Sequence, residues 1–178
     1  LPVDGVNLDE KVEVTSLLLK SGATIQEMNQ VRKHLSQIKG GWLAKAVYPA
    51  KCLHLVISDV LGDDLGTIAS GPLAPDESTF ADARAVLEQY EIWDEVPESV
   101  RVHLEAAENE TPKPGDPVFE GVTTHILANH ETPAQIVKEL VPGCEVLTTN
   151  LNGEARDQAT ALLKRVKEPG VLYVATGE

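Results

Sequence analysis

Short apolar runs alternate with stretches of helical periodicity in the second half of the chain, and this alternation constrains the fold more than any other feature. Apolar runs at 123–128, 144–149 and 171–175 are separated by segments in which apolar residues recur every three or four positions. The order strand, helix, strand, helix, strand is typical of βαβ units, whose strands pair in parallel. A further apolar run, Cys52–Ser58, predicts a parallel strand buried on both faces. The predicted fold class is therefore α/β.

The first half of the chain predicts helices. Asn7 followed by Glu10, and Thr24 followed by Glu27, have the spacing of a capping box, in which each side chain bonds the other residue's backbone N–H group. Apolar residues recur at helical spacing after both pairs. Helices are predicted over four segments before residue 108, namely 8–19, 25–38, 80–90 and 97–107.

The charge balance and the cysteines limit the partners and the compartment. Asp plus Glu number 28 and Lys plus Arg 15, which gives a formal net charge of −13. Nucleic acids and anionic membranes bind basic surfaces, so we expect neither as a partner. Cys52 and Cys144 lie far apart without a C-x-x-C pattern, which indicates reduced thiols in a cytoplasmic protein. No apolar run approaches the ~18 residues of a membrane helix, and no signal peptide is visible.

Polar side chains follow three of the predicted strands. The candidates are Asp59, Asp63, Asp64, Asn129, Asn152 and Glu154. Ligands of open α/β sheets bind beyond the carboxyl ends of the strands. Carboxylates in the loop after Asp59 can accept a substrate hydroxyl proton or hold Mg²⁺. The structural alternative is a turn or cap role for Asp63 and Asp64, and a favourable helix-dipole position for Glu154.

One predicted helical face in the first half carries cations. Arg32, Ser36 and Lys39 recur at steps of four and three residues, and such a face can grip a carboxylate or a phosphate. A solvated polar face is the structural alternative. The turn Ser70–Pro72 can present backbone N–H groups to an anion or serve only as a turn. The five histidines show no metal-ligand spacing, and neither a Walker loop nor a G-x-G-x-x-G motif is present.

Several short motifs follow one another in a fixed order along nearly the whole chain. They are Ser21–Ile25, Val31–Ser36 with Lys39–Gly41, Ser58–Asp63, Ile68–Pro72, Glu110–Lys113 and Gly153–Arg156. Together they resemble the glycerate 2-kinase family, also called MOFRL-type glycerate kinases. The resemblance is weakest between about 85 and 108 and around 130 to 145.

The resemblance implies a three-layer α/β/α, Rossmann-like domain with a mostly parallel sheet. Residues 1–178 would form a single α/β domain, as an internal fragment of the larger N-terminal domain of a longer protein. It also implies the family's reaction, in which ATP and a divalent metal phosphorylate glycerate to 2-phosphoglycerate. The family's catalytic lysine would lie upstream of Leu1, so we expect that the isolated fragment can be inactive. Trp42 and Thr176 depart from the family, which has Arg and Gly at these positions.

The resemblance also implies roles for individual residues. Asp59 matches the family's catalytic aspartate, and we expect its carboxylate to orient the glycerate hydroxyl and take its proton. Asp63 or Asp64 would help to place Mg²⁺. The residues predicted to bind substrate or phosphate are Arg32, Lys33, Ser36, Lys39, Ser70, Asn129, Glu154 and Arg156. Phosphoryl transfer depends on positioning and charge neutralisation more than on covalent chemistry.

Two other functions remain open. A hydroxypyruvate reductase, a label that this family sometimes carries, would use NAD(P)H, although no dinucleotide fingerprint is visible. A non-catalytic domain that binds a small anion is the third reading. The partners expected for the kinase are glycerate and a nucleotide, and the sequence leaves open a homodimer.

Overall fold

The computed structural model describes residues 1–177, and these divide into two compact units. Unit 1 consists of Leu1–His54 and Leu65–Thr123, and unit 2 of Leu55–Asp64 and the residues from Thr124 onward. That residues 1–178 form one α/β domain stays a prediction. None of the described helices combines the length and the apolar character needed to span a bilayer.

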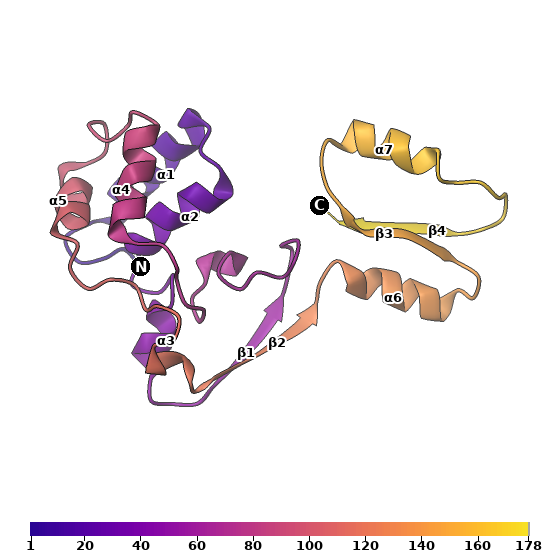
Figure 1. The fold of residues 1–178 in the computed structure, drawn as a ribbon, viewed down its shortest axis with the longest axis horizontal. Helices are drawn as coiled ribbons and strands as arrows, with labels where there is room; N and C mark the ends of the chain where they lie inside the picture. Colours follow the sequence, from indigo (N-terminus) through magenta and orange to yellow (C-terminus); the bar gives the residue numbers. More distant parts are fainter. Residues whose placement is uncertain (178) are drawn as a thin grey trace. The chain divides into compact units, whose positions relative to one another are not determined.

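Unit 1 is mainly helical, as predicted for the first half of the chain. Its helices are α1 Leu8–Ser21, α2 Ile25–His34, α3 Trp42–Val47, α4 Phe80–Gln89 and α5 Glu98–Ala106, with 3-10 turns η1 at Ile68–Ser70 and η2 at Pro117–Phe119. The four longer helices lie together in Figure 1, where α1 packs on α2, α2 on α4 and α4 on α5. All four predicted helices are therefore confirmed, and α3 is an addition.

Both predicted capping boxes are present, at the starts of α1 and α2. Asn7 Oδ1 accepts a hydrogen bond from Glu10 N at 2.9 Å, and Asn7 N donates to Glu10 Oε2 at 2.8 Å. Thr24 and Glu27 make the same reciprocal pair. Gly22 ends α1 with a φ of +83°, a left-handed conformation that costs glycine little. Local sequence thus sets where these helices begin and where α1 ends.

Aliphatic side chains form the core between these helices. Leu18 of α1, Leu87 of α4 and Val100 of α5 are completely buried. Burying such a side chain stabilises a fold by about 1.5–3 kcal/mol relative to leaving it exposed. The helices of unit 1 are therefore held together mainly by this cluster.

The prediction that the second helix continues to Ile38 is wrong, because α2 ends at His34. Ser36 breaks the helical pattern: its hydroxyl oxygen accepts hydrogen bonds from the backbone N–H groups of Ile38 at 3.4 Å and Lys39 at 3.3 Å. Its backbone also pairs with Pro2 in an isolated antiparallel bridge. The lysine of the predicted cationic face therefore lies beyond the helix.

Parallel strands confirm the α/β fold class, and the first pair is β1, Cys52–Ile57, with β2, Val122–Ala128. Cys52 N donates to Gly121 O at 2.9 Å near one end of the pair, and Ser58 N donates to Ala128 O at 2.8 Å just beyond the other. Because the bonded positions advance together along both strands, the strands run parallel and their carboxyl ends meet at one edge.

The second strand pair belongs to unit 2. β3, Glu145–Leu151, pairs in parallel with β4, Tyr173–Gly177. Helix α6, Glu131–Leu140, contacts both strands, and α7, Ala155–Leu163, connects them. Figure 1 shows the two helices on opposite sides of this pair. The predicted order strand, helix, strand, helix, strand is therefore present, and β3, α7 and β4 form a βαβ unit, whereas β2 pairs with β1 in a separate sheet.

The prediction that β1 is buried on both faces is wrong for the described residues. Leu53, Leu55 and Ile57 are 62%, 55% and 75% exposed, whereas Val56 between them is buried. The physical reason is that β1 pairs with β2 alone in a two-stranded sheet, and one face carries these three side chains into solvent.

Two neighbouring leucines of α1 test the core assignment. Leu18 is completely buried and Leu19 is 63% exposed. We expect Leu18→Ala to lower the free energy of unfolding by about 2–5 kcal/mol, because it removes buried contacts and leaves a cavity. Leu19→Ala is the matched control, with an expected change within ~0.5 kcal/mol. Urea denaturation measures both, and equal effects would contradict this packing.

Glu27 joins the start of α2 to the end of α4. Its Oε2 accepts hydrogen bonds from Thr24 N and from the Tyr90 hydroxyl, both at 2.8 Å, and its Oε1 accepts one from Gln89 Nε2 at 3.1 Å. The Thr24 hydroxyl also donates to Oε2, at 2.7 Å. This bond has the largest effect, followed by those from Thr24 N and Tyr90, and together they lower the pKa of Glu27 to about 2. The hydrogen bonds between the two helices therefore stabilise the ionised form of the Glu27 carboxylate.

The pH dependence of stability should report this contact. A carboxylate with a lowered folded-state pKa stabilises the fold above its ordinary pKa of 4.5, and this contribution is lost as the pH falls towards about 2. We expect Glu27→Gln to lower the urea midpoint at pH 6, and the difference from the native sequence to shrink between pH 4.5 and pH 2. Glu10→Gln, which changes a capping box without cross-helix bonds, should lower the midpoint less. A loss that does not vary with pH would contradict the assignment.

Candidate functional site

A cavity of about 390 Å³ lies at the carboxyl ends of the strands of unit 2. Its walls come from the loop after β1, the turn between β2 and α6, and the end of β3. The lining residues are Leu61, Gly62, Asp63, Asn129, His130, Glu131, Thr149 and Asn150. Ligands of α/β sheets bind at this edge, and two of the predicted site residues, Asp63 and Asn129, line the cavity.

Asn129 fixes the turn between β2 and α6. Its Oδ1 accepts hydrogen bonds from the backbone N–H groups of Glu131 at 3.0 Å and Thr132 at 3.3 Å, which caps the first turn of α6. Its Nδ2 donates to Asp63 Oδ2 at 2.6 Å. Both the oxygen and the nitrogen of the Asn129 amide are therefore hydrogen-bonded within the protein, and the side chain links the loop after β1 to the start of α6.

Asp63 is a partly exposed carboxylate on an unusual backbone conformation. Its φ of +55° lies in the left-handed region, which Asp and Asn tolerate better than most residues. Hydrogen bonding to Ser58, and then to Asn129, lowers the pKa of Asp63, and the charge of His130 acts in the same direction. Asp63 is thus held ionised, and a carboxylate in that form can attract a cation.

Asp59 lies directly beyond β1, and it is exposed. Its backbone carbonyl accepts a hydrogen bond from His130 Nε2 at 3.1 Å, which links it to a residue of the cavity wall. The ion pairs formed among residues 1–177 do not include Asp59. Its carboxylate can therefore meet a substrate hydroxyl without first losing an ionic partner. Asp64, also predicted as a metal residue, is exposed in the same loop.

His130 was missed by the sequence analysis, and its partners lie far away along the chain. Besides its bond to Asp59, its own backbone carbonyl accepts a hydrogen bond from Thr176 Oγ1. The resemblance implies a glycine at position 176, and the threonine side chain adds a bond that glycine cannot make. The position of His130 directly after Asn129, at the end of a predicted strand, is the signal that could have indicated it.

Glu154 and Arg156 lie at the start of α7, and both are exposed. Neither belongs to the wall of the cavity of unit 2. The loop before them is held by a hydrogen bond from Gln158 Nε2 to Asn152 O at 2.7 Å. Their predicted part in binding stays a prediction.

Arg32, Lys39 and Ser70 come together in unit 1. Lys39 Nζ donates to Ala69 O at 2.7 Å and lies 3.4 Å from Ser70 Oγ. The Ser70 hydroxyl donates to Asn29 Oδ1 at 2.9 Å, and Arg32 Nη1 donates to the same oxygen at 3.3 Å. The buried Asn29 side chain therefore binds two of the predicted residues directly, Arg32 and Ser70, and Lys39 lies beside Ser70.

Lys33 and Ser36 have other partners. Lys33 Nζ forms an ion pair at 3.1 Å with Asp76, whose side chain is only 1% exposed. Removing one member of such a pair leaves a buried charge uncompensated. Ser36 is buried, and its hydroxyl lies 3.4 Å from Leu1 O. These contacts have structural roles, and a contact of either residue with ligand stays a prediction.

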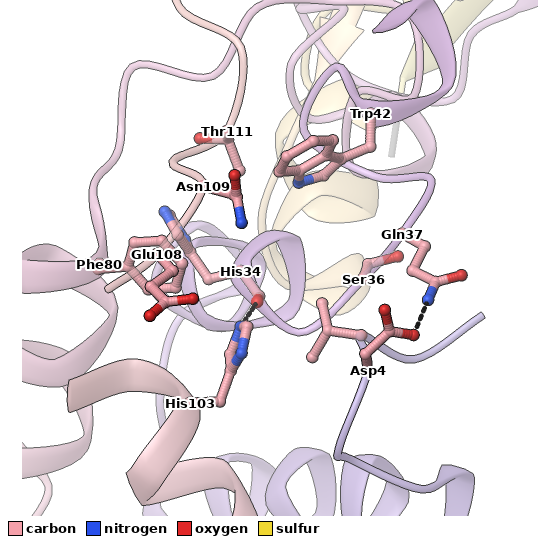
Figure 2. A pocket seen from close by; sticks show the side chains of 11 residues that line it. Asp4, His34, Ser36, Gln37, Trp42, Phe80, His103, Glu108, Asn109 and Thr111 are labelled. Atoms are coloured by element: carbon pink, nitrogen blue, oxygen red, sulfur yellow. Dashed lines mark hydrogen bonds between the residues drawn. The ribbon is translucent and has the colours of Figure 1, made fainter. Parts of the chain in front are cut away.

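A second cavity, of about 420 Å³, opens in unit 1 and is drawn in Figure 2. Trp42 forms part of its wall, and Lys45 Nζ lies 4.5 Å from the centre of the indole ring. His103 Nε2 is bonded to His34 O at 2.9 Å on another side of the cavity. Ser36 alone among the predicted binding residues lines it.

The described residues offer carboxylates for a metal but no complete ligand set. No group of three or more His, Cys, Asp or Glu side chains suited to a metal ion occurs within residues 1–177. Protein-bound Mg²⁺ usually has one or two carboxylate ligands, with phosphate oxygens and water completing its shell. Asp63 and Asp64 fit that mode of binding.

Known proteins similar to this chain include glycerate kinases. It is 46% identical over 172 residues to the D-glycerate 2-kinase of Thermotoga maritima, a match that covers 94% of this chain and 39% of that protein. A putative hydroxypyruvate reductase of Agrobacterium vitis is 54% identical over 115 residues, covering 65% of this chain and 26% of the relative. The crystal structure of a Thermotoga maritima glycerate kinase superposes with a TM-score of 0.81 at 43% identity, covering this whole chain and 44% of that one.

These matches confirm the resemblance seen in the motifs, and the chain spans about two-fifths of the length of the glycerate kinases named above. A family model described as a domain of unknown function, DUF4147, matches residues 1–105. Because that match covers more than half of the chain, this protein belongs to the DUF4147 family.

Proposed function

We propose that this chain is part of a glycerate kinase, which transfers a phosphoryl group from ATP to glycerate and yields 2-phosphoglycerate. The observation that carries the proposal is the exposed carboxylate of Asp59 at the carboxyl end of β1, which forms no ion pair within residues 1–177. The Asp59 backbone is bonded to the wall of a cavity. The similarity to proteins named as glycerate kinases supports the same reaction.

Asp59 acts as the general base in this proposal. Its carboxylate accepts the proton of the glycerate hydroxyl as that oxygen forms a bond to the γ-phosphorus of ATP. The bond between the γ-phosphorus and the bridging oxygen breaks, and ADP leaves with the electron pair. The His130 hydrogen bond to the Asp59 carbonyl holds the backbone of the base in place during the transfer.

Unit 1 carries a second proposed binding group, which would hold a carboxylate or a phosphate. Arg32 and Lys39 are the donors, and Ser70 and Asn29 hold them in position through the bonds described above. Guanidinium and ammonium groups are the side chains that proteins use for carboxylates and phosphates. Asp63 and Asp64 would hold Mg²⁺, which when bound neutralises charge on the nucleotide phosphates.

The cytoplasm is the proposed compartment, because Cys52 and Cys144 are both free thiols. A homodimer stays a prediction.

The test of the base is Asp59→Asn in the full-length enzyme. Loss of general-base help should lower kcat by about 10²–10⁴-fold with little change in the thermal melting temperature, because the side chain is exposed. Coupled measurement of ADP release with glycerate and ATP gives kcat and KM. Asp94→Asn, at another highly exposed aspartate, is the control and should keep normal turnover. Normal turnover of the Asp59 variant would sink this assignment.

A hydroxypyruvate reductase is the second candidate, favoured by the similarity to the Agrobacterium vitis protein of that name. A reductase consumes NADH with hydroxypyruvate, whereas a kinase does not. We expect the absorbance of NADH to stay constant with hydroxypyruvate, and ADP to form with ATP and glycerate. Steady NADH oxidation without ADP formation would reverse the choice.

A further inference from the structure

Three cations of unit 1 act on one another electrostatically and have no acidic partner within residues 1–177, although the protein as a whole is strongly acidic. Lys11 projects from α1, Arg32 from α2, and Lys39 follows α2. The ion pairs formed among residues 1–177 include none of the three. In a chain with a formal net charge of −13, carboxylates are abundant. A cluster of cations that pairs with none of them is therefore a specific feature of this surface.

Neutral oxygen atoms hold these cations in place. Lys11 Nζ donates to Leu35 O at 2.8 Å, Lys39 Nζ donates to Ala69 O at 2.7 Å, and the guanidinium of Arg32 donates to an amide oxygen at 3.3 Å. An ammonium group has three N–H donors and a guanidinium five, so each group retains donors for a ligand. The charges are positioned but not neutralised.

The cations repel one another, and an anion would relieve this repulsion. The pKa of Lys11 is lowered to about 8. Burial is the largest cause, and the positive charges of Lys39 and then Arg32 act in the same direction. Burial and the charge of Arg32 also lower the pKa of Lys39. Lys11 caps the end of α2 through Leu35 O. That role alone does not explain why two further cations lie near it.

The backbone beneath Lys39 is strained. Ala69 and Ser70 have φ values of +53° and +62°, in the left-handed region that L-residues other than glycine occupy at a cost of roughly 1–2 kcal/mol each. This conformation directs Ala69 O to the ammonium of Lys39, while the buried Ser70 hydroxyl bonds to Asn29. The strain is retained where it fixes a cation, as expected of a preformed binding site.

We propose that Lys11, Arg32 and Lys39 together bind a dianionic phosphoryl group, with Lys11 as a ligand-binding residue that the sequence patterns did not indicate. A dianion matches three gathered cations better than a single carboxylate does, because it neutralises more of their charge at short range. The inference deepens the proposed kinase function and rests on it for the source of the phosphoryl group, which is the nucleotide or the phosphorylated acid.

Calorimetric titration of the full-length enzyme tests the site, with inorganic phosphate, ADP and 2-phosphoglycerate as three separate probes. Lys11→Met should weaken binding about tenfold, the loss expected for one charge-assisted hydrogen bond. Lys20→Met, at an exposed lysine on the last turn of the same helix, should leave binding unchanged. The probe whose affinity falls identifies the source of the phosphoryl group. Equal affinities of the two variants for all three probes would overturn the proposal.

The pH dependence provides a measurement that a purely structural role would not change. The pKa of Lys11 is lowered to about 8 in the free protein, so binding of an anion should take up a proton. If loss of the Lys11 charge weakens binding about tenfold, affinity should fall about fourfold between pH 7.5 and pH 9. Titrations in buffers with different ionisation enthalpies measure the uptake. Lys11→Arg, which stays charged at pH 9, should bind with little pH dependence and no uptake. The same pH profile in Lys11→Arg as in the native enzyme would contradict the role of Lys11, even if Lys11→Met fails to fold.

Failure of this inference and failure of the kinase proposal give different results. Phosphate binding that depends on Lys11, in an enzyme that forms no ADP from ATP and glycerate, would overturn the kinase alone. Normal ADP formation with phosphate binding insensitive to Lys11 would overturn the phosphoryl site alone.

Discussion

The parallel pairing of β1 with β2 is the interaction on which the carboxylate site depends. Its final hydrogen bond, from Ser58 N to Ala128 O at 2.8 Å, places the two strand ends side by side. The residues that follow, Asp59 after one strand and Asn129 after the other, are therefore brought together by main-chain geometry before any side chain interacts. A shift of register by one residue would turn every side chain to the opposite face and separate them.

Asn129 and His130 convert that backbone geometry into a defined site. The Asn129 amide holds Asp63 through one end and the first turn of α6 through the other. The His130 ring holds the Asp59 carbonyl, and its own carbonyl is held by Thr176 at the end of β4. Three strand ends are thus coupled through two consecutive residues. In this arrangement the proposed base is fixed by its backbone, while its carboxylate stays available for chemistry.

The parts of the structure that follow from local sequence could be predicted, and the parts that depend on distant contacts could not. The capping boxes at Asn7 and Thr24 and the βαβ order of the second half depend on neighbours a few positions apart, and both were predicted correctly. The end of α2 was not, because Ser36 bonds to Leu1 across more than thirty positions and pairs there with the N-terminal segment. The burial of β1 was also overestimated, because an apolar run does not reveal which faces its neighbours cover.

The same distinction explains the candidate site. Asp59, Asp63 and Asn129 stand at strand ends, where the fold class alone points to ligand binding. No sequence pattern distinguishes Lys11 from the other polar residues of α1. Its proposed role depends on Arg32 and Lys39, whose charges act on it where α1 packs against α2. A sequence pattern shows which side of a helix is polar, but it does not show which charges of two helices share one space. Electrostatic sites built across helices therefore require the structure, whereas sites built at the ends of parallel strands are visible in the sequence.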